Sequence, residues 1–253
     1  MGSLNTIWEM PEKFPGLPKN TIHLWRIVVA DFEGYLEKFE GLLNATEKQK
    51  FNQFKYQNLK INFLVCRGAL RYLLSMYMNE TPKDIKLKTT PDGKPFLAED
   101  HHAKIAFNIS HTRADCLIAL SRTYEVGVDI ELIKPLPNLK DMAASYLTVS
   151  ELRNFNCLSP DEQLARFYLL WTAKEALLKA IGCGLMIHPG QINVEEIYSE
   201  KKLTIEDRSN LIELPAITLA KLSISEGYAA WMAYIGESAR IACYLLTQNL
   251  VSM

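Results

Sequence analysis

Several features that mark common protein classes are scarce or absent in this sequence of 253 residues. Its five cysteines are scattered, odd in number and never spaced as CxxC, which argues against a disulfide framework and a structural zinc site. No apolar run approaches the roughly 18 residues that a membrane-spanning helix needs. A basic segment followed by an apolar one, as in a secretory signal, is also missing. We therefore expect a cytoplasmic protein with no membrane partner.

The sequence also lacks an excess of either charge. Its 28 Lys and Arg residues balance 29 Asp and Glu residues, so no overall field attracts nucleic acid. Walker, GxGxxG, HExxH and GxSxG motifs are absent, which removes the usual signals of nucleotide hydrolysis, dinucleotide binding, zinc proteolysis and a serine hydrolase. With 48% hydrophobic residues, the chain can bury a core as one large domain or two small ones.

The spacing of apolar residues predicts a mixed α+β protein. Two long core helices are expected at 58–78 and 160–181, the second ending at Gly182 as a left-handed cap. Shorter helices are expected at 32–42 and 46–55. Capping boxes are predicted at TEKQ 46–49, TVSE 148–151 and SPDE 159–162. Strands are expected at 22–29, 105–109, 115–121, 125–133, 191–197, 215–223, 228–235 and 240–247.

A faint internal repeat suggests that the chain has two related α+β halves. VCRGALRYLL at 65–74 resembles TAKEALLKAI at 172–181, and each segment is a predicted core helix followed by strands. Chance similarity between amphipathic helices explains the likeness about as well. The repeat predicts an N-terminal half at 1–124 and a C-terminal half at 125–253, meeting at a seam near residue 125.

The stretch GVDIEL, residues 127–132, sets two acids two residues apart in an apolar run. On a strand, Asp129 and Glu131 point to the same face, where they repel each other unless a cation or a proton intervenes. Hard carboxylate oxygens at this spacing suit Mg²⁺, whereas a solvated acidic face is the simpler alternative. Gly127 allows a backbone or a ligand to approach closely. The apolar neighbours are expected to face the core: Val126, Val128, Ile130 and Leu132.

A third acid interrupts the apolar stripe of the predicted helix at 160–181. Glu175 stands where an apolar or small residue is expected, and Lys179 follows four residues later on the same face. An acid at the edge of a core needs a compensating partner, so Glu175 is a candidate metal ligand or base and Lys179 a candidate phosphate contact. A simple helix ion pair between them is the alternative. Lys174 points elsewhere and could be solvated.

A further candidate is FNISHT at 107–112, at the end of a predicted strand. Ser110 and His111 could bind phosphate or act as nucleophile and base. Adjacent Ser and His residues are weak evidence for a triad, because triad partners come from distant segments.

Together these stretches resemble one family closely. GKP (93–95), FNISHT (107–112), GVDIE (127–131) and WTAKEALLK (171–179) occur in the order and approximate spacing of the 4′-phosphopantetheinyl transferases of the surfactin-synthetase-activating type. The resemblance implies a monomeric enzyme that moves the 4′-phosphopantetheine arm of coenzyme A to a serine of an acyl or peptidyl carrier protein, releasing 3′,5′-ADP. The implied fold is a pseudo-twofold pair of α+β halves with coenzyme A in the cleft between them.

The resemblance also implies roles for individual residues. Asp129, Glu131 and Glu175 correspond to Mg²⁺ ligands and Lys179 to the lysine that contacts the pyrophosphate. Glu175 is the preferred base, and Glu131 with its water is the competitor. The residues expected to bind coenzyme A are Lys50, Arg67, Gly93, Lys94, Pro95, Asn108, Ser110, His111 and Lys179. Asn52 and Gln53 stand where many relatives have basic residues, so the contacts of the 3′-phosphate are left open.

Two other functions stay open at this point. One is a different Mg²⁺-dependent phosphoryl enzyme on an unrelated fold, and the other is a non-catalytic module that binds carrier proteins. Fatty-acid, polyketide and nonribosomal-peptide carriers are equally compatible with the sequence. Candidate docking segments are 112–116 and 135–160, although the apolar residues of the second segment are better explained as core.

Overall fold

The structure is a computed structural model that describes residues 6–90, 93–98, 104–182, 187–195, 204–206, 211–213 and 216–252. The chain divides into two compact units. The first unit comprises Ile7–Thr123 and Arg240–Met253, and the second comprises Met1–Thr6 and Tyr124–Ala239. These units differ from the predicted halves at the chain ends, because the final strand pairs within the first unit. The cleft expected between the halves stays a prediction.

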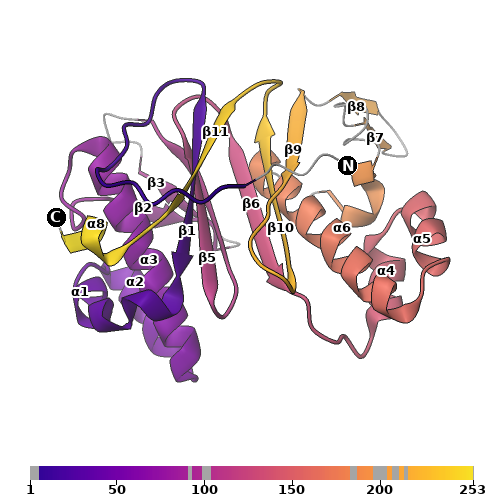
Figure 1. The fold of residues 1–253 in the computed structure, drawn as a ribbon, viewed down its shortest axis with the longest axis horizontal. Coiled ribbons are helices and arrows are strands. Elements are labelled where there is room, and N and C mark those ends of the chain that lie inside the picture. The colour runs from indigo at the N-terminus through magenta and orange to yellow at the C-terminus, as the bar shows by residue number, and fades with distance from the viewer. Residues whose placement is uncertain are drawn as a thin grey trace. The chain divides into compact units, whose positions relative to one another are not determined.

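The first unit is built on a four-stranded sheet in the order β11-β1-β5-β4 (Figure 1). Its strands are β1 (Thr21–Val28), β4 (Ala106–His111), β5 (Asp115–Ser121) and β11 (Arg240–Leu245). β1 pairs antiparallel with β5, which pairs antiparallel with β4. β11 runs parallel to β1, with Thr21 opposite Arg240. The chain therefore returns to the first unit for its last strand.

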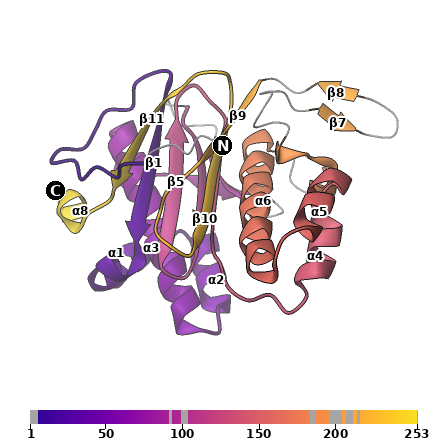
Figure 2. The same ribbon diagram turned by 45° about the vertical axis from the view of Figure 1, so that its right-hand side comes forward.

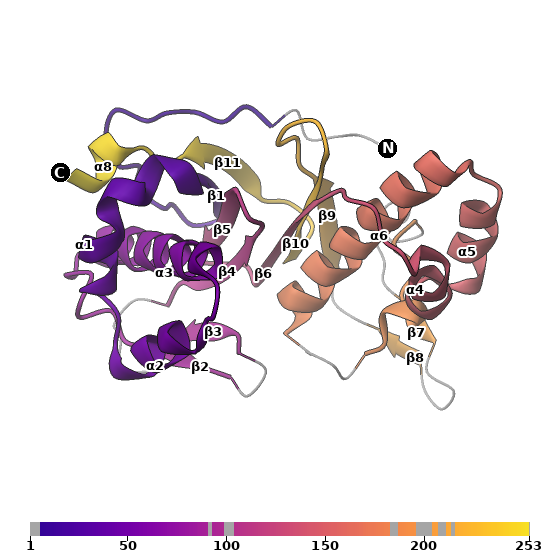
Figure 3. The same ribbon diagram turned by 90° about the horizontal axis from the view of Figure 1, so that it is seen from below.

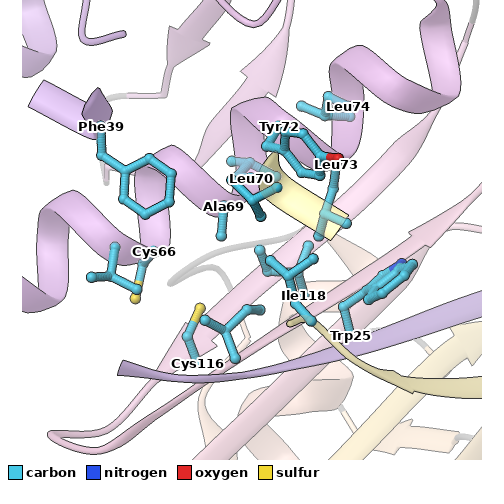
Figure 4. Close-up of a cluster of buried hydrophobic side chains, with 14 of the residues drawn as sticks. Trp25, Phe39, Cys66, Ala69, Leu70, Tyr72, Leu73, Leu74, Cys116 and Ile118 are labelled. Atoms are coloured by element: carbon cyan, nitrogen blue, oxygen red, sulfur yellow. The ribbon is translucent and has the colours of Figure 1, made fainter. Parts of the chain in front are cut away.

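The long helix α3 (Gln57–Met78) covers this sheet as the sequence predicts. Every residue from Asn62 to Ser75 is buried, so the helix lies in the interior rather than on the surface. Figure 4 shows Leu70 and Leu73 of α3 directed toward Trp25 and Ile118 of the sheet. The helix ends at Asn79, which adopts a left-handed conformation with φ of 56°.

Smaller elements complete the first unit. They are the 3₁₀ helix η1 (Val29–Tyr35), the helices α1 (Leu36–Glu40), α2 (Ala45–Gln53) and α8 (Gln248–Ser252), and the hairpin of β2 (Leu87–Thr89) and β3 (Pro95–Leu97). The predicted capping box at 46–49 is wrong by two residues. Asn44 caps α2 and Glu47 completes the box, because Asn44 and Glu47 offer the same pair of hydrogen bonds one half-turn earlier.

The second unit is built on a three-stranded antiparallel sheet in the order β6-β10-β9. The strands are β6 (Val126–Leu132), β9 (Ile217–Lys221) and β10 (Tyr228–Ile235). Helix α6 (Pro160–Ile181) packs on one face of this sheet, and α4 (Leu139–Tyr146) and α5 (Val149–Asn156) lie on the other side of α6 (Figure 2). A short hairpin of β7 (Thr204–Glu206) and β8 (Leu211–Glu213) is also present.

The ends of the second unit's helices follow the predicted signals. Thr148 and Glu151 form the capping box of α5, and the carboxylate of Glu162 accepts the backbone and hydroxyl hydrogens of Ser159 at the start of α6. Pro160 occupies the first helical position, and Gly182 caps the helix with φ of 73°.

The strand predicted at 191–197 is wrong over its described residues. A 3₁₀ helix, η3 (Pro189–Gln191), begins the segment, and the backbone N–H of Val194 donates to the carboxylate of Glu151 at 3.1 Å. The acceptor is thus a side chain of α5 instead of a neighbouring strand. Within the described ranges, no helix is long and apolar enough to cross a membrane.

Candidate active site

The acids of GVDIEL lie where β6 and α6 meet. A Cβ atom added to Gly127 would lie 2.0 Å from the carbonyl oxygen of Ala176 and 2.5 Å from the nitrogen of Ala180. Only glycine therefore allows this close approach of strand and helix. Because side chains alternate along a strand, Asp129 and Glu131 share the helix-facing side of β6 with Gly127. The sequence allowed a backbone or a ligand to approach Gly127, and in the structure it is the backbone of α6 that does so.

This arrangement corrects the predicted facing of β6. Val126, Val128 and Ile130 are buried as expected, but α6 covers the opposite face, which carries the acids. The strand is thus buried on both sides, and alternation of apolar and polar residues alone does not reveal which side the helix covers. Leu132, expected in the core, is exposed at the end of the strand.

Lys179 of α6 reaches Asp129 directly. Its Nζ lies 2.6 Å from Oδ1 of Asp129 and 3.2 Å from the carbonyl oxygen of Val128. The side chain of Asp129 is only 6% exposed, whereas that of Lys179 is 28% exposed. The ion pair therefore joins a buried carboxylate to an ammonium that solvent or a ligand can still reach. The simpler prediction, in which Lys179 merely pairs with Glu175 along the helix, misses this contact.

Glu131 and Glu175 interact electrostatically with Asp129. Burial raises the pKa of Glu175, the charge of Asp129 raises it further, and Lys179 lowers it. Burial raises the pKa of Glu131 in the same way, Asp129 and Glu175 add to the shift, and Lys134 and Lys179 oppose it. The three acids predicted from separate segments are thus close enough to influence one another.

The chemistry of this donor set fits a divalent cation. The charge of Asp129 raises the pKa of both Glu131 and Glu175, so added positive charge would stabilise these carboxylates, and Mg²⁺ prefers such hard oxygen ligands. The side-chain positions fit less well. Among the residues that the structure describes, no three His, Cys, Asp or Glu side chains are grouped so that they could hold a metal ion. In this arrangement the ammonium of Lys179 is the cation that contacts Asp129.

The solvated position considered for Lys174 is wrong. Its side chain is completely buried, and Nζ lies 2.6 Å from Oε2 of Glu151. Burial lowers the pKa of Lys174, and the charge of Glu151 opposes this shift. Glu151 is predicted only as part of a capping box, and its pairing with Lys174, 23 residues away, carries no sequence signal. Leu147 and Phe155, in the candidate docking segment 135–160, are core residues.

In the first unit, the structure brings Lys50 and the GKP stretch together. Helix α2 lies beside the β2–β3 hairpin (Figure 3), and Asn44 donates to the carbonyl oxygen of Leu87. Nζ of Lys50 would lie 3.8 Å from a Cβ atom on Gly93, which has φ of +91°. The ammonium of Lys50 thus lies beside Gly93, whose positive φ disfavours any other residue.

The rest of the GKP stretch forms a turn and the start of a strand. The backbone N–H of Lys94 donates to the hydroxyl of Thr90 at 3.0 Å, and Gly93 donates to the carbonyl of Thr90. Pro95 is buried at the beginning of β3. Residues 91 and 92, which precede the GKP stretch, lie outside the described residues.

The residues of FNISHT lie on β4, on two different faces. Asn108 and Ser110 are buried on one side, whereas His111 follows the side of Phe107 and Ile109, which pack in the core with α3. His111 is exposed at the end of the strand. Ser110 and His111 therefore point in opposite directions, which disfavours their direct cooperation as nucleophile and base.

A buried amide not anticipated from the sequence supports the end of β4. Asn62 of α3 donates from Nδ2 to the carbonyl oxygen of Thr112 at 2.9 Å. The hydroxyl of Thr112 accepts from the backbone N–H of Asp115, closing the turn from β4 to β5. A polar residue within the apolar stretch of α3 was the available signal for Asn62.

Arg67 belongs to a buried charge cluster. Its Nε lies 3.3 Å from Oε1 of Glu47, and the other carboxylate oxygen of Glu47 accepts two hydrogen bonds from Arg71, from Nε at 3.1 Å and Nη2 at 2.7 Å. Burial lowers the pKa of Arg67, Glu47 opposes the shift, and Arg71 adds to it. Two guanidinium groups around one carboxylate leave net positive charge. Arg71, one turn beyond Arg67 on a buried helix, was the signal that sequence analysis missed.

Two protein-family models match consecutive parts of the chain. A model described as the 4′-phosphopantetheinyl transferase superfamily matches residues 125–229. A model described as the N-terminal part of 4′-phosphopantetheinyl transferase matches residues 25–123.

Curated relatives have the same activity in their names. The chain is 31% identical over 222 residues to the 4′-phosphopantetheinyl transferase HetI of Nostoc sp., covering 87% of this chain and 90% of that protein. It is 30% identical to the 4′-phosphopantetheinyl transferase gsp of Aneurinibacillus migulanus, covering 75% of this chain and 76% of that protein. It is 29% identical to the rat L-aminoadipate-semialdehyde dehydrogenase-phosphopantetheinyl transferase, covering 65% and 59%.

A solved structure, the holo-[acyl-carrier-protein] synthase of Thermotoga maritima, matches 45% of this chain and 63% of its own, with 16% identity and a TM-score of 0.31. That score carries no argument, so the assignment depends on the sequence matches. The family models and the match along nine-tenths of HetI agree with the motifs at 93–95, 107–112, 127–131 and 171–179. The chain belongs to the 4′-phosphopantetheinyl transferase superfamily.

Proposed function

We propose that this phosphopantetheinyl transferase uses Asp129, Glu131 and Glu175 to hold Mg²⁺ while it transfers the 4′-phosphopantetheine arm of coenzyme A to a serine of a carrier protein. The observation that carries the proposal is the buried Asp129, bound by Lys179 at 2.6 Å, whose charge acts on both Glu131 and Glu175. In a helix-on-sheet seam where the chain could have used apolar residues, such a cluster is costly unless cations bind it.

The chemistry requires positive charge more than covalent help. Attack on the diphosphate of coenzyme A needs its negative charge neutralised and its reacting atoms held in line. Mg²⁺, when bound, supplies charge that stabilises the diphosphate oxygens. Lys179 supplies a second cation, and its partly exposed side chain can reach a ligand while Asp129 holds it in place.

Glu175 is the better candidate for the base that takes the proton of the carrier serine. Glu175 lies one helical turn before Lys179 on α6, so it would lie beside the diphosphate that Lys179 contacts. Glu131, acting with a bound water, is the second candidate.

The first unit would bind the remainder of coenzyme A. The positive cluster around Arg67 and the ammonium of Lys50 beside Gly93 suit a phosphate group, and Arg67 is the better candidate for the 3′-phosphate. Lys94, Pro95, Asn108, Ser110 and His111 are the further contacts that the family motifs suggest. Arg67→Ala should weaken coenzyme A more than its 3′-dephospho form, and equal losses for both would remove Arg67 from that contact.

The decisive experiment is a transfer assay with intact protein. The protein is incubated with coenzyme A, Mg²⁺ and apo carrier proteins from fatty-acid, polyketide and nonribosomal-peptide synthases, and the carriers are weighed by mass spectrometry. We expect the mass of a phosphopantetheinyl group on at least one carrier, loss of transfer when EDTA is added, and recovery with Mg²⁺. Transfer that persists in EDTA would refute the metal role. Carrier binding without any mass gain would indicate a non-catalytic module.

A monomer is part of the same proposal. Because Asp129, Glu131, Glu175 and Lys179 come from a single unit of one chain, the acid cluster needs no second copy. Light scattering coupled to gel filtration should give the mass of one chain, and an active species that exists only as a dimer would contradict it.

A further inference from the structure

The ammonium of Lys174 is saturated by acceptors from three separate segments. It donates to Oε2 of Glu151 at 2.6 Å, to the carbonyl oxygen of Tyr146 at 2.8 Å and to that of Pro189 at 3.0 Å. An ammonium group has three N–H donors, so these contacts use all of them. Its side chain has no exposed surface. Lys174 therefore has neither a donor nor a path for a substrate phosphate.

Glu151 adds two backbone hydrogen bonds to this network. Its Oε2 also accepts the backbone N–H of Thr148 at 2.9 Å, and its Oε1 accepts that of Val194 at 3.1 Å. The ion pair thus ties the end of α4, the start of α5 and the segment containing η3 to one position of α6. That position directly precedes Glu175.

Tyr146 connects the network to the face of α6 that carries the acid. Its ring stacks on Trp171, with centroids 4.3 Å apart and planes inclined by 9°. Trp171 lies four residues before Glu175, so the two share one face of the helix. A displacement of Tyr146 would therefore shift Trp171 and, through the shared face of the helix, the position of Glu175.

We propose that Lys174 is a positioning residue: by holding the Tyr146 backbone and Glu151 it fixes the Tyr146–Trp171 stack and with it the orientation of Glu175. The inference rests on the proposed function, since it assigns Glu175 to the reacting site. Of the two lysines in WTAKEALLK, only Lys179 would then contact substrate, and Lys174 acts through its neighbours.

A buried charge pair is an expensive way to join helices, because two apolar residues of similar size often stabilise a core equally well. Unlike apolar contacts, the three directed hydrogen bonds of Lys174 fix the relative positions of the segments that they join. Supporting side chains of this kind typically contribute 10- to 100-fold to metal affinity or activity.

The test compares Lys174→Met with the double variant Lys174→Met/Glu151→Gln. Met keeps the length of the side chain, and Gln retains a capping-box residue while removing the charge that Met would leave unpaired. For both variants we expect kcat to fall about 10- to 100-fold at saturating coenzyme A, with KM for coenzyme A changed less than about threefold. Calorimetric titration of Mg²⁺ in the presence of coenzyme A should show binding weakened about tenfold or more.

Arg122→Met is the control. Arg122 is a half-buried cation of the first unit that donates to the backbone carbonyls of Leu17 and Tyr77, outside the residues proposed to bind coenzyme A. It should lower thermal stability as Lys174→Met does, yet leave kcat and Mg²⁺ affinity per folded molecule unchanged.

Three results would overturn the inference. If Lys174→Met changed kcat and Mg²⁺ affinity no more than Arg122→Met, Lys174 would be structural only. If KM for coenzyme A rose while kcat held, Lys174 would contact substrate. If the double variant regained full kcat, the geometry of Glu175 would not depend on the pair. Were the wild-type protein itself inactive, the proposed function would fail, and the Mg²⁺ titration would still decide the role of Lys174.

Discussion

Each of the two units packs a long core helix on a sheet, but the units differ in the residues that the strand before that helix presents to it. α3 and α6 are each 22 residues long. Each packs on a sheet that contains three strands in matching order, one before the helix and two after it, β1-β5-β4 and β6-β10-β9, and the first unit adds β11 beside β1 (Figure 1). In each unit, a capping-box glutamate of an earlier helix, Glu47 or Glu151, is buried against a cation of the core helix. The likeness of residues 65–74 and 172–181 aligns those cations, Arg67 with Lys174.

The difference lies on the strand that precedes the core helix. In the first unit β1 presents Trp25 and Ile27 to the core under α3, both fully buried. In the second unit β6 presents Asp129 and Glu131 to α6, and the same alignment replaces Gly68 of α3 with Glu175. Since the first unit folds around an apolar seam, the acids of the second are not required by the arrangement. The comparison supports the proposal that these acids take part in the reaction.

Replacing the cation of the acidic seam should have the largest effect. Lys179→Gln keeps a hydrogen bond to Asp129 through its amide but removes the charge. We expect transfer to fall about 10²- to 10³-fold, as when a preorganised charge-stabilising donor is lost. Lys140→Gln, at an exposed lysine of α4, is the control and should be active. A loss of transfer that merely tracks unfolding of the Lys179 variant would favour a structural role.

The buried polar groups of the first unit should affect stability and its pH dependence instead. The hydroxyl of Tyr77 accepts from Nε1 of Trp25 at 2.9 Å and is also hydrogen-bonded to Nδ1 of His23 at 2.7 Å. Burial lowers the pKa of His23 to about 4, and the charge of Arg240 contributes to the shift.

The unfolded chain therefore binds a proton at His23 before the folded chain does. The stabilisation is complete above about pH 6.5 and is lost as pH falls toward 4, a total of about 3 kcal/mol in the free energy of unfolding. Urea titrations from pH 7 to pH 4 should show this slope, and His23→Gln should reduce it while His188→Gln, at an exposed site, retains it. An unchanged slope in His23→Gln would contradict the assignment.

Two core glycines offer a smaller test, Gly127 at the contact of β6 with α6 and Gly68 of α3 at its contact with Phe39 of α1. A Cβ on Gly127 would collide with the backbone of α6, which cannot rotate away, whereas on Gly68 it would meet the ring of Phe39. Both substitutions to Ala should cost about 1–3 kcal/mol of stability. Only Gly127→Ala should also reduce kcat per folded molecule, because it separates β6 from the helix that carries Glu175. Equal kcat losses in both would weaken the contrast between the units.

Much of this arrangement was predictable because its signals are local. The long helices at 58–78 and 160–181, the strands around 105–133 and the cap at Gly182 follow from periodicity and from residues with fixed conformational preferences. The carboxylates 129, 131 and 175 were recognisable because each interrupts an apolar pattern.

What failed depends on partners distant in sequence. The sequence around Lys174 gives no sign of its ion pair with Glu151. A solvated Lys174 was therefore considered, whereas the side chain is buried. The segment at 191–195 alternates like a strand, yet its Val194 N–H pairs with Glu151. The last strand was expected in the second half, but β11 pairs with β1 across more than 200 residues of sequence.

The most direct test of the acidic seam is Asp129→Asn, assayed for transfer and for Mg²⁺ binding in the presence of coenzyme A. Asparagine keeps the shape of the side chain and an acceptor for Lys179 while it removes the charge that links the three acids. We predict transfer reduced about 10²-fold or more, weakened Mg²⁺ binding and an unchanged circular dichroism spectrum, with Asp141→Asn on exposed α4 as active control. Full transfer and unchanged Mg²⁺ affinity in Asp129→Asn would contradict the account.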